Sequence, residues 1–184
     1  MSLINRNPNE MTIPSANYFF ENLFYNCTTL MTAPELPAIN LYNYCYSYMF
    51  YNCTSLITAP ALPATTLTDM CYQGMFRGCS SLINPPILNA TTLTQNCYGH
   101  MFRDCTSLVN APALPSTTLT SQCYSNMFNG CSSMITAPVL PAETLISQCY
   151  TSIFRGCSLL NNVTILALTN INSNNLTAWG YTTS

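Results

Sequence analysis

The stretch CYQGMFRGCSSL, from Cys71 to Leu82, contains two cysteines that lie eight residues apart. Near copies of it stand at Cys45–Leu56, Cys97–Leu108 and Cys123–Met134, each displaced by 26 residues from its neighbour. Self-similarity at a fixed period between about 20 and 50 residues is typical of solenoids, propellers and other repeat arrays. The repeated stretch therefore predicts a repeat architecture with a unit of 26 residues.

The same shift arranges the whole middle of the chain in columns. All eleven cysteines fall into two of them, which run from Cys45 to Cys149 and from Cys27 to Cys157. A third column holds a phenylalanine in every unit, from Phe24 to Phe154. We expect six coils, which begin near Phe19, Cys45, Cys71, Cys97, Cys123 and Cys149.

The first half of each coil carries an apolar pattern with helical spacing. Cys71 with Met75, and Tyr72 with Phe76, are pairs four residues apart, and such pairs share one stripe of a short helix. Two positions after each phenylalanine stands Asn, Gly or Asp, the residue types that best tolerate positive φ. We expect this column to end each helix in the left-handed conformation; it comprises Asn26, Asn52, Gly78, Asp104, Gly130 and Gly156.

The second half of each coil predicts a brief strand. A β-branched residue follows the leucine in CTSLITAPAL, and Pro60 follows soon after. Proline lacks the donor that a strand ladder requires, so it should end the strand. We expect strands of three or four residues, about 56–59 and its equivalents, stacked in parallel at about 4.8 Å.

These elements together predict an α/β repeat solenoid of six coils, each with a short parallel strand and a short helix. Because each coil contacts only its neighbours, the two ends need caps. We expect an N-terminal cap at residues 1–18, the solenoid at residues 19–160, and a C-terminal cap at residues 161–184, where the repeat breaks.

The cysteines occupy apolar positions of the pattern, which favours two columns of buried, reduced thiols. Disulfides are the alternative, since stacked coils bring cysteines within bridging distance, but the odd total and the parallel side-chain directions count against them. Zinc is disfavoured because the sequence has no C-x-x-C pair. His100 could join Cys97 and Cys105, but its column otherwise varies, and we expect an exposed position there.

Composition excludes several classes of partner. Only 5% of the residues are charged, none is lysine, and the net charge is −2, so no basic field exists to attract nucleic acid. No apolar run approaches the ~18 residues of a membrane helix, so we expect no membrane insertion. The first residues, MSLINRNPNEMTIPS, lack the features of a secretory signal. We expect either a protein that is not exported by that route or a segment of a longer exported protein.

The unit C-Y-x-x-M-F-x-[GND]-C-[ST]-[ST]-L-x-x-[AP]-P-x-L-P-A-T-T-L, as it stands from Cys45 to Leu67, resembles the BspA-like leucine-rich repeats. The resemblance covers about residues 19–160. It implies a right-handed solenoid and a role in adhesion or attachment, as found on bacterial surfaces, in some phages and in a few protozoa. It implies neither catalytic residues nor a cofactor.

The residues by themselves also argue against an enzyme. A nucleophile needs a base within hydrogen-bond reach, and the chain has one histidine, in a variable column. We therefore expect a non-enzymatic binding module that attaches to a protein or glycan on a cell surface. The alternative is a structural or receptor-binding component of a larger assembly such as a phage virion, where the partners are neighbouring subunits.

Two outward columns are the candidate partner-binding residues. One lies at the end of the expected helix and holds Tyr25, Tyr51, Arg77, Arg103, Asn129 and Arg155. The other lies beside the expected strand and holds Thr32, Thr58, Asn84, Asn110 and Thr136. Arg77 and Arg103 would lie roughly 5 Å apart and would repel each other unless solvated or sharing an anion. Tyrosine and arginine are enriched where binding energy concentrates, so the first column is the stronger candidate, for a glycan stacked on the tyrosines or an acidic protein patch.

Overall fold

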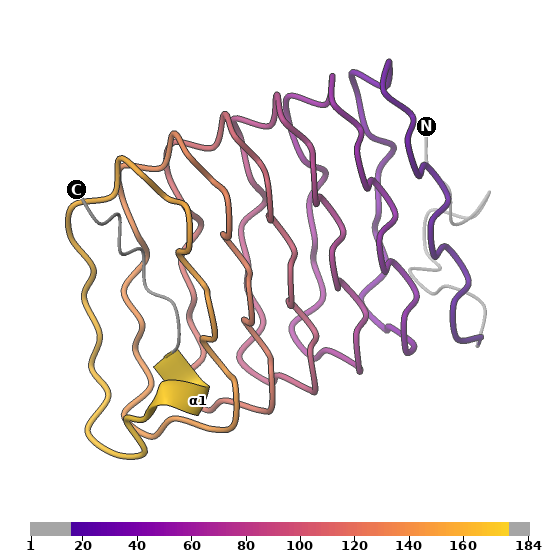
Figure 1. Cartoon of the computed structure of the whole chain (residues 1–184). Coiled ribbons are helices and arrows are strands. Elements are labelled where there is room, and N and C mark those ends of the chain that lie inside the picture. Colours follow the sequence, from indigo (N-terminus) through magenta and orange to yellow (C-terminus); the bar gives the residue numbers. More distant parts are fainter. Residues whose placement is uncertain (1–15, 177–184) are drawn as a thin grey trace.

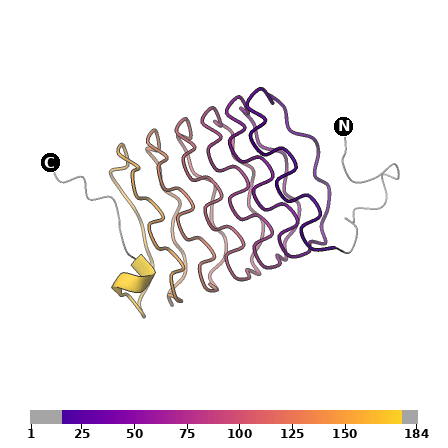
Figure 2. The same cartoon turned by 45° about the vertical axis from the view of Figure 1, so that its right-hand side comes forward.

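The computed structural model describes residues 16–176 as one continuous stack of flattened coils. The chain starts at one end of the stack and reaches the other end by adding coil upon coil (Figure 1; Figure 2). Backbone hydrogen bonds join residues 25 positions apart, and isolated parallel bridges join residues 26 positions apart, such as Thr58 with Asn84. The repeat solenoid and the 26-residue register are thereby confirmed.

Each coil has two sides, which we name by the residues of the second coil. The turn wall is residues 42–53 and its equivalents, and the return wall is residues 56–67 and its equivalents. Side chains from both walls meet in one hydrophobic cluster, with Tyr46, Phe50 and Leu56 all at 1% exposure or less. The two walls are therefore the two layers around a single core.

The helix predicted in the turn wall is wrong. The described residues contain one α-helix, α1 (Ser173–Leu176), which lies at the C-terminal end of the stack and outside the repeats. In the turn wall, the amides of odd-numbered residues of the second coil donate to carbonyls three residues back, as Ser47 does to Tyr44. The amides of even-numbered residues donate to the next coil, as Tyr46 does to Cys71 at 3.0 Å. The wall is thus a ribbon of consecutive β-turns cross-linked between coils.

Positive φ angles at every fourth residue explain why this ribbon is not helical. In the second coil they occur at Tyr44 (60°), Tyr48 (50°) and Asn52 (55°), each two residues into a turn closed by a backbone hydrogen bond. A positive φ in this position is the mark of a type II turn, and it interrupts the i to i−4 ladder of a helix. The freed amide instead pairs with the adjacent coil, which offsets the local strain.

The column read as a helix end does have positive φ, from 55° at Asn52 to 80° at Gly130. Its role differs, because it is the last of three such positions in each turn wall. At Gly78 a Cβ would collide with Oδ1 of Asn52, whose side chain leans over from the preceding coil. Glycine suits this position because it adopts the angle without strain and leaves room for the Asn52 side chain, whereas Asn52 and Asp104 adopt a similar angle in their own coils.

The return wall contains isolated β-bridges in place of the predicted strands of three or four residues. Single residues form parallel bridges at intervals of four, namely Thr58, Leu62 and Thr66 with their counterparts in the next coil. Pro60 and Pro63 lie between these positions and have no amide to donate. Proline thus reduces each strand to isolated bridges while the parallel register persists.

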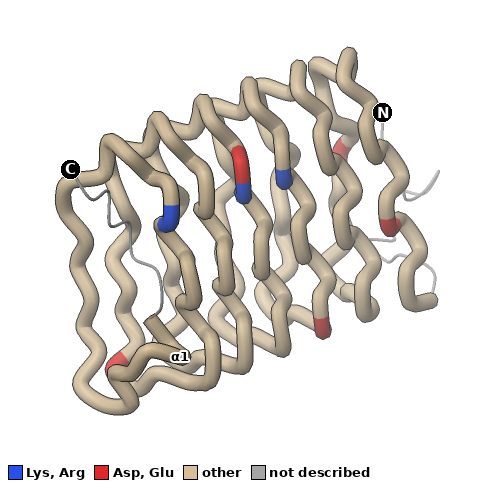
Figure 3. Tube along the Cα trace, in the orientation of Figure 1, with Lys and Arg blue, Asp and Glu red and all other residues tan. Residues whose placement is uncertain are grey.

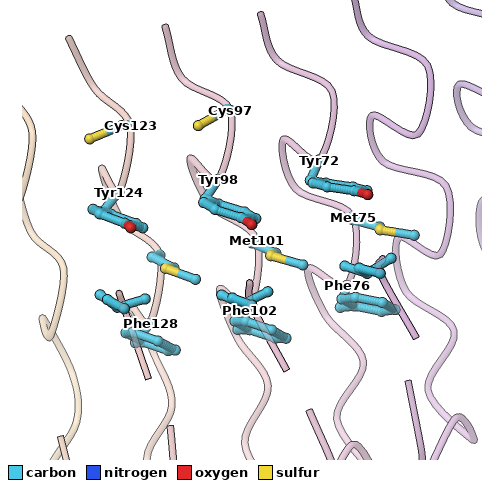
Figure 4. Packing of buried hydrophobic residues seen from close by; sticks show 14 of the residues in the cluster. Tyr72, Met75, Phe76, Cys97, Tyr98, Met101, Phe102, Cys123, Tyr124 and Phe128 are labelled. Atoms are coloured by element: carbon cyan, nitrogen blue, oxygen red, sulfur yellow. The ribbon is translucent and has the colours of Figure 1, made fainter. Parts of the chain in front are cut away.

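Ladders of identical side chains fill the core. Phenylalanine rings of successive coils stack at centroid distances of 5.4–5.8 Å, and tyrosine rings from Tyr46 to Tyr150 stack at 5.8–5.9 Å. Methionines lie between these two ladders (Figure 4). Each coil therefore buries the same set of groups against its two neighbours, as a quasi-one-dimensional stack requires.

The ends of the chain depart from the repeat. Residues 1–15 of the expected N-terminal cap and residues 177–184 of the expected C-terminal cap lie outside the described part. Residues 164–176 continue the stack, since Leu140 bridges Ile165 and Thr144 bridges Thr169, a register of 25. Asn175 then receives the amide of Tyr150 on its carbonyl and the amide of Gln148 on its side chain. This segment covers donors that the last coil would otherwise expose.

Candidate functional site

The arginines and tyrosines predicted to bind a partner form one row along the turn wall. This arginine–tyrosine row comprises Tyr25, Tyr51, Arg77, Arg103, Asn129 and Arg155, each of which directly precedes the last positive-φ position of its coil. All six side chains are exposed or half-buried. Figure 3 shows the basic residues of the described chain along a single line across the coils. The structure therefore brings this predicted set together on one surface.

The ring of Tyr51 has little free face, whereas Tyr25, at the end of the row, stacks on Tyr51 alone among residues 16–176 and is 46% exposed. Tyr25 and Tyr51 stack with centroids 4.6 Å apart, and the guanidinium carbon of Arg77 lies 5.4 Å from the centroid of the Tyr51 ring. Tyr48 adds an edge contact to Tyr51 at 6.0 Å. A sugar ring stacks on an aromatic face, and both faces of Tyr51 already have neighbours. What Tyr51 offers a partner is its hydroxyl and its ring edge.

An internal carboxylate resolves the repulsion expected between the stacked arginines. Oδ2 of Asp104 lies 3.4 Å from Nε of Arg103 and 3.9 Å from Nε of Arg77. Asp104 belongs to the positive-φ column and is half exposed, so the pairs are solvent-screened. The shared anion is thus part of the protein itself. Arg155, in the last coil, is exposed and forms no ion pair within residues 16–176.

The second predicted column lies on the return wall and is fully exposed. Thr32, Thr58 and Asn84 are linked by parallel bridges, and so are Asn110 and Thr136. Nδ2 of Asn84 donates to Oγ1 of Thr58 at 3.1 Å. This Thr/Asn column is therefore an outward ladder, as expected, on the opposite wall from the arginine–tyrosine row.

The sequence interpretation missed an apolar column beside those threonines and asparagines. Met31 is 65% exposed, Ile57 42%, Ile83 53% and Ile135 51%, and Val109 completes this aliphatic column. Ile87 and Val139, four residues beyond Ile83 and Ile135, are 77% and 51% exposed. The signal was visible, since an apolar residue follows this leucine or methionine in five of the six units, the exception being Asn161. These residues also favour a strand, so their sequence alone does not indicate an exposed column.

The comparisons with known proteins bear on the repeat as a whole. A scan against protein families matched the BspA type leucine rich repeat region in six copies, over residues 4–111 and 75–179. The chain belongs to this family. A search of curated proteins and a search of solved structures each found no match. The family and the stacked coils together indicate a protein-binding repeat module.

In this BspA-type repeat the lone histidine lies close to the arginines and is not the exposed residue that its variable column predicted. His100 is half-buried, with φ of 58°, and its Nδ1 has no hydrogen-bond partner. Burial, reinforced by the charges of Arg103 and Arg77 and opposed by Asp104, lowers the pKa of His100 from 6.5 to about 4. The imidazole is therefore neutral at physiological pH.

Replacing His100 by Asn should remove a pH-dependent loss of stability. Between pH 6.5 and about 4 the unfolded chain protonates His100 before the folded chain does, so the free energy of unfolding falls as the pH falls. After allowance for solvent screening we expect about 1–2 kcal/mol over this window. Asn22 and Asn126 hold the equivalent position at φ of 57° and 54°, so asparagine fits the backbone.

The measurement is urea unfolding of the parent and of His100→Asn at pH 7 and pH 4. Both chains contain the same carboxylates, so the difference between the two pH dependences reports on His100. Identical pH dependences would contradict the position of His100 described above.

Both cysteine columns are thiol ladders. Every cysteine lies within residues 16–176 and is a free thiol, and ten of the eleven are buried while Cys27 is exposed. In the second column, from the second coil onward, the thiol donates to the phenylalanine carbonyl of the coil before, as Cys79 does to Phe50 at 3.1 Å. Burial raises the pKa of Cys53 to about 11 and that of Cys97 to about 12. These thiols are structural groups with little thiolate character.

The described residues contain no cluster of metal-ligating side chains. No group of three or more His, Cys, Asp or Glu residues between 16 and 176 is placed to hold a metal ion. Within the same residues no helix has the length and apolar character needed to cross a membrane. Two shallow hollows lie along the return wall, one of about 550 Å³ beside Glu143 and Thr144 and one of about 420 Å³ beside Glu35 and Pro60. Neither hollow contains a histidine or a cysteine.

Proposed function

We propose that this protein is a non-enzymatic attachment module that binds another protein through its arginine–tyrosine row. The observation that carries the proposal is the continuous arrangement of Tyr25, Tyr51, Arg77 and Arg103 on adjacent coils. Tyrosine and arginine are the residue types most enriched at the centres of protein interfaces. The buried thiols and the neutral, half-buried His100 support a binding role over a catalytic one.

The geometry favours a protein over a glycan as the ligand. With both faces of Tyr51 covered, the middle of the row presents a hydroxyl group, a ring edge and guanidinium donors. Such donors match carboxylates and backbone carbonyls of a partner. Arg155, which lacks an internal ion pair among the described residues, extends the row as a further donor. We therefore infer a partner with an acidic patch, presented either on a cell surface or by a neighbouring subunit of an assembly such as a phage virion.

The test compares the parent with a triple variant, Tyr51→Ser, Arg77→Ser and Arg103→Ser, in binding to purified surface proteins and to a glycan array. None of the three side chains lies in the core, so the variant should unfold at nearly the parent's urea concentration. We expect the parent to bind at least one protein and the variant to bind it at least tenfold more weakly. Truncating side chains at the centre of an interface typically costs about 2 kcal/mol or more of binding free energy.

A matched variant on the opposite wall is the control. Thr58→Ala, Asn84→Ala and Asn110→Ala should leave the affinity for that protein within about threefold of the parent's. If the control weakens binding and the row variant does not, the Thr/Asn column is the binding surface. Binding to glycans alone would refute the choice of a protein ligand.

A further inference from the structure

The outward surface of the return wall carries a repeated apolar feature that the proposed function leaves unused. It contains the aliphatic column, Met31, Ile57, Ile83, Val109 and Ile135, with Ile87 and Val139 four residues further along their coils. The Thr/Asn column runs directly beside it. Monomeric proteins rarely expose contiguous apolar patches beyond a few hundred Å², and larger patches with a polar border mark interaction sites.

The charges of the two walls differ in a way that restricts the partner. The three arginines of the described chain all lie on the turn wall, whereas the return wall carries Glu35 and Glu143 near its two ends and no cation. Between these ends the return wall is neutral. It therefore offers no attraction to an acidic protein, to nucleic acid or to an anionic membrane surface. It offers shape and apolar contact instead.

The spacing of the aliphatic column points to a partner with the same repeat. Its side chains recur once per coil, at the interval at which parallel bridges such as Thr32 with Thr58 hold neighbouring coils together. A partner that presents apolar groups at the same interval can contact all of them in register. A second copy of the chain does so along the whole stack when a two-fold axis runs parallel to the stack, because each coil then meets the same coil of the other copy.

We propose that two copies of the chain associate face to face through their return walls, with the aliphatic and Thr/Asn columns at the centre of the interface. Five coils at about 4.8 Å and a wall about 30 Å wide give a face on the order of 700 Å² per copy. Stable interfaces bury roughly 800 Å² per partner, so the face is of the size that a dimer needs. The arginine–tyrosine rows of both copies point outward from this dimer and stay free.

Sedimentation equilibrium of the intact chain over a range of concentrations tests the proposal. We expect twice the mass of the chain for the parent, and the mass of one chain for the double variant Ile57→Lys and Ile83→Lys, which places lysines of both copies in the interface. The control Gln95→Lys and Thr106→Lys adds the same charge at exposed positions outside the return wall and should remain dimeric. Protection of the ten buried thiols from labelling verifies that each variant is folded.

A parent that stays monomeric at all concentrations overturns the proposal, and so does a folded double-lysine variant that remains dimeric. A monomeric parent whose binding to a purified surface protein is abolished by the two lysines would assign the return wall to a different protein. The triple variant of the arginine–tyrosine row should remain dimeric. If that variant is monomeric, the two copies associate through the turn wall, and the proposed return-wall dimer is wrong. This outcome leaves the proposed binding of another protein to be judged from its own assay.

Discussion

Replacing Phe102 by Ala should lower the free energy of unfolding by about 3–5 kcal/mol. The ring is completely buried and stacks at 5.7 Å between Phe76 and Phe128, so its removal leaves a cavity between two other rings. Because each coil contacts only its neighbours, the damage should be local at first. We expect hydrogen exchange to accelerate most in the coils of Phe76, Phe102 and Phe128, and least at the two ends of the stack.

Phe19 provides the control for this substitution. It is 45% exposed at the N-terminal end of the stack, so Phe19→Ala removes the same side chain at a cost of about 1 kcal/mol or less. Urea unfolding measures the free energies, and hydrogen exchange measured by mass spectrometry locates the opening. Equal protection loss in all coils of Phe102→Ala would show that the stack unfolds as a single cooperative unit and would contradict the nearest-neighbour description.

Thiol labelling of the native protein should modify one cysteine quickly and ten slowly. Cys27 is exposed, while the other ten are buried and their reaction requires the coils to open. Burial also raises the pKa of these thiols, to about 11 for Cys45 and about 12 for Cys123, which suppresses the reactive thiolate. We expect rates that differ by on the order of a hundredfold or more.

Intact-mass spectrometry during the labelling counts the modified thiols directly. Cys27→Ser should abolish the fast phase and leave the slow phase unchanged, because that thiol is on the surface of the first coil. In urea all cysteines should react together. Rapid modification of several cysteines in the folded parent would show that the ladders are open to solvent.

The period of the repeat could be predicted because the same residues recur at an interval of 26 with almost no drift. Alignment of the cysteine, phenylalanine and leucine columns is sufficient to place the coils in parallel and in register. The columns also separate inside from outside, since a position that holds Phe50, Phe76 and Phe102 in succession is expected to be buried, and all three are. Burial of ten cysteines follows from the same argument and is confirmed.

The conformation within the coil could not be predicted in the same way. Cys71 with Met75 and Tyr72 with Phe76 are spaced as on a helix, but successive turns with a positive φ at every fourth residue produce the same four-residue period. One sign of this was present in the column of Asn22, Gly74, His100 and Asn126, whose residue types include several that tolerate positive φ. Tyr44 and Met70 hold the first positive-φ position of their coils, and their residue types do not indicate such an angle. They adopt it here because hydrogen bonds between coils offset the strain of the positive φ.

The surfaces were predictable only in part. Polar columns such as Thr32 to Thr136 are expected outside, and the arginine–tyrosine row followed from its variable residues. The aliphatic column was not predicted, since β-branched residues near a proline are typical both of a buried strand and of an exposed edge. The ion pairs of Asp104 depend on how side chains lean from one coil to the next, which a column of residue types does not specify.

Hydrogen bonds between coils, in place of a helical ladder, hold the turn wall together, and scalar couplings across hydrogen bonds, measured by NMR, test this arrangement most directly. The amide of Tyr72 donates to the carbonyl of Cys97 in the next coil at 3.1 Å, and that of Gln73 donates to Met70 at 3.2 Å. We predict a coupling between the Tyr72 nitrogen and the Cys97 carbonyl carbon. A coupling from Tyr72 to the carbonyl carbon of Thr68, four residues back, would show a helix in the turn wall and contradict the structure.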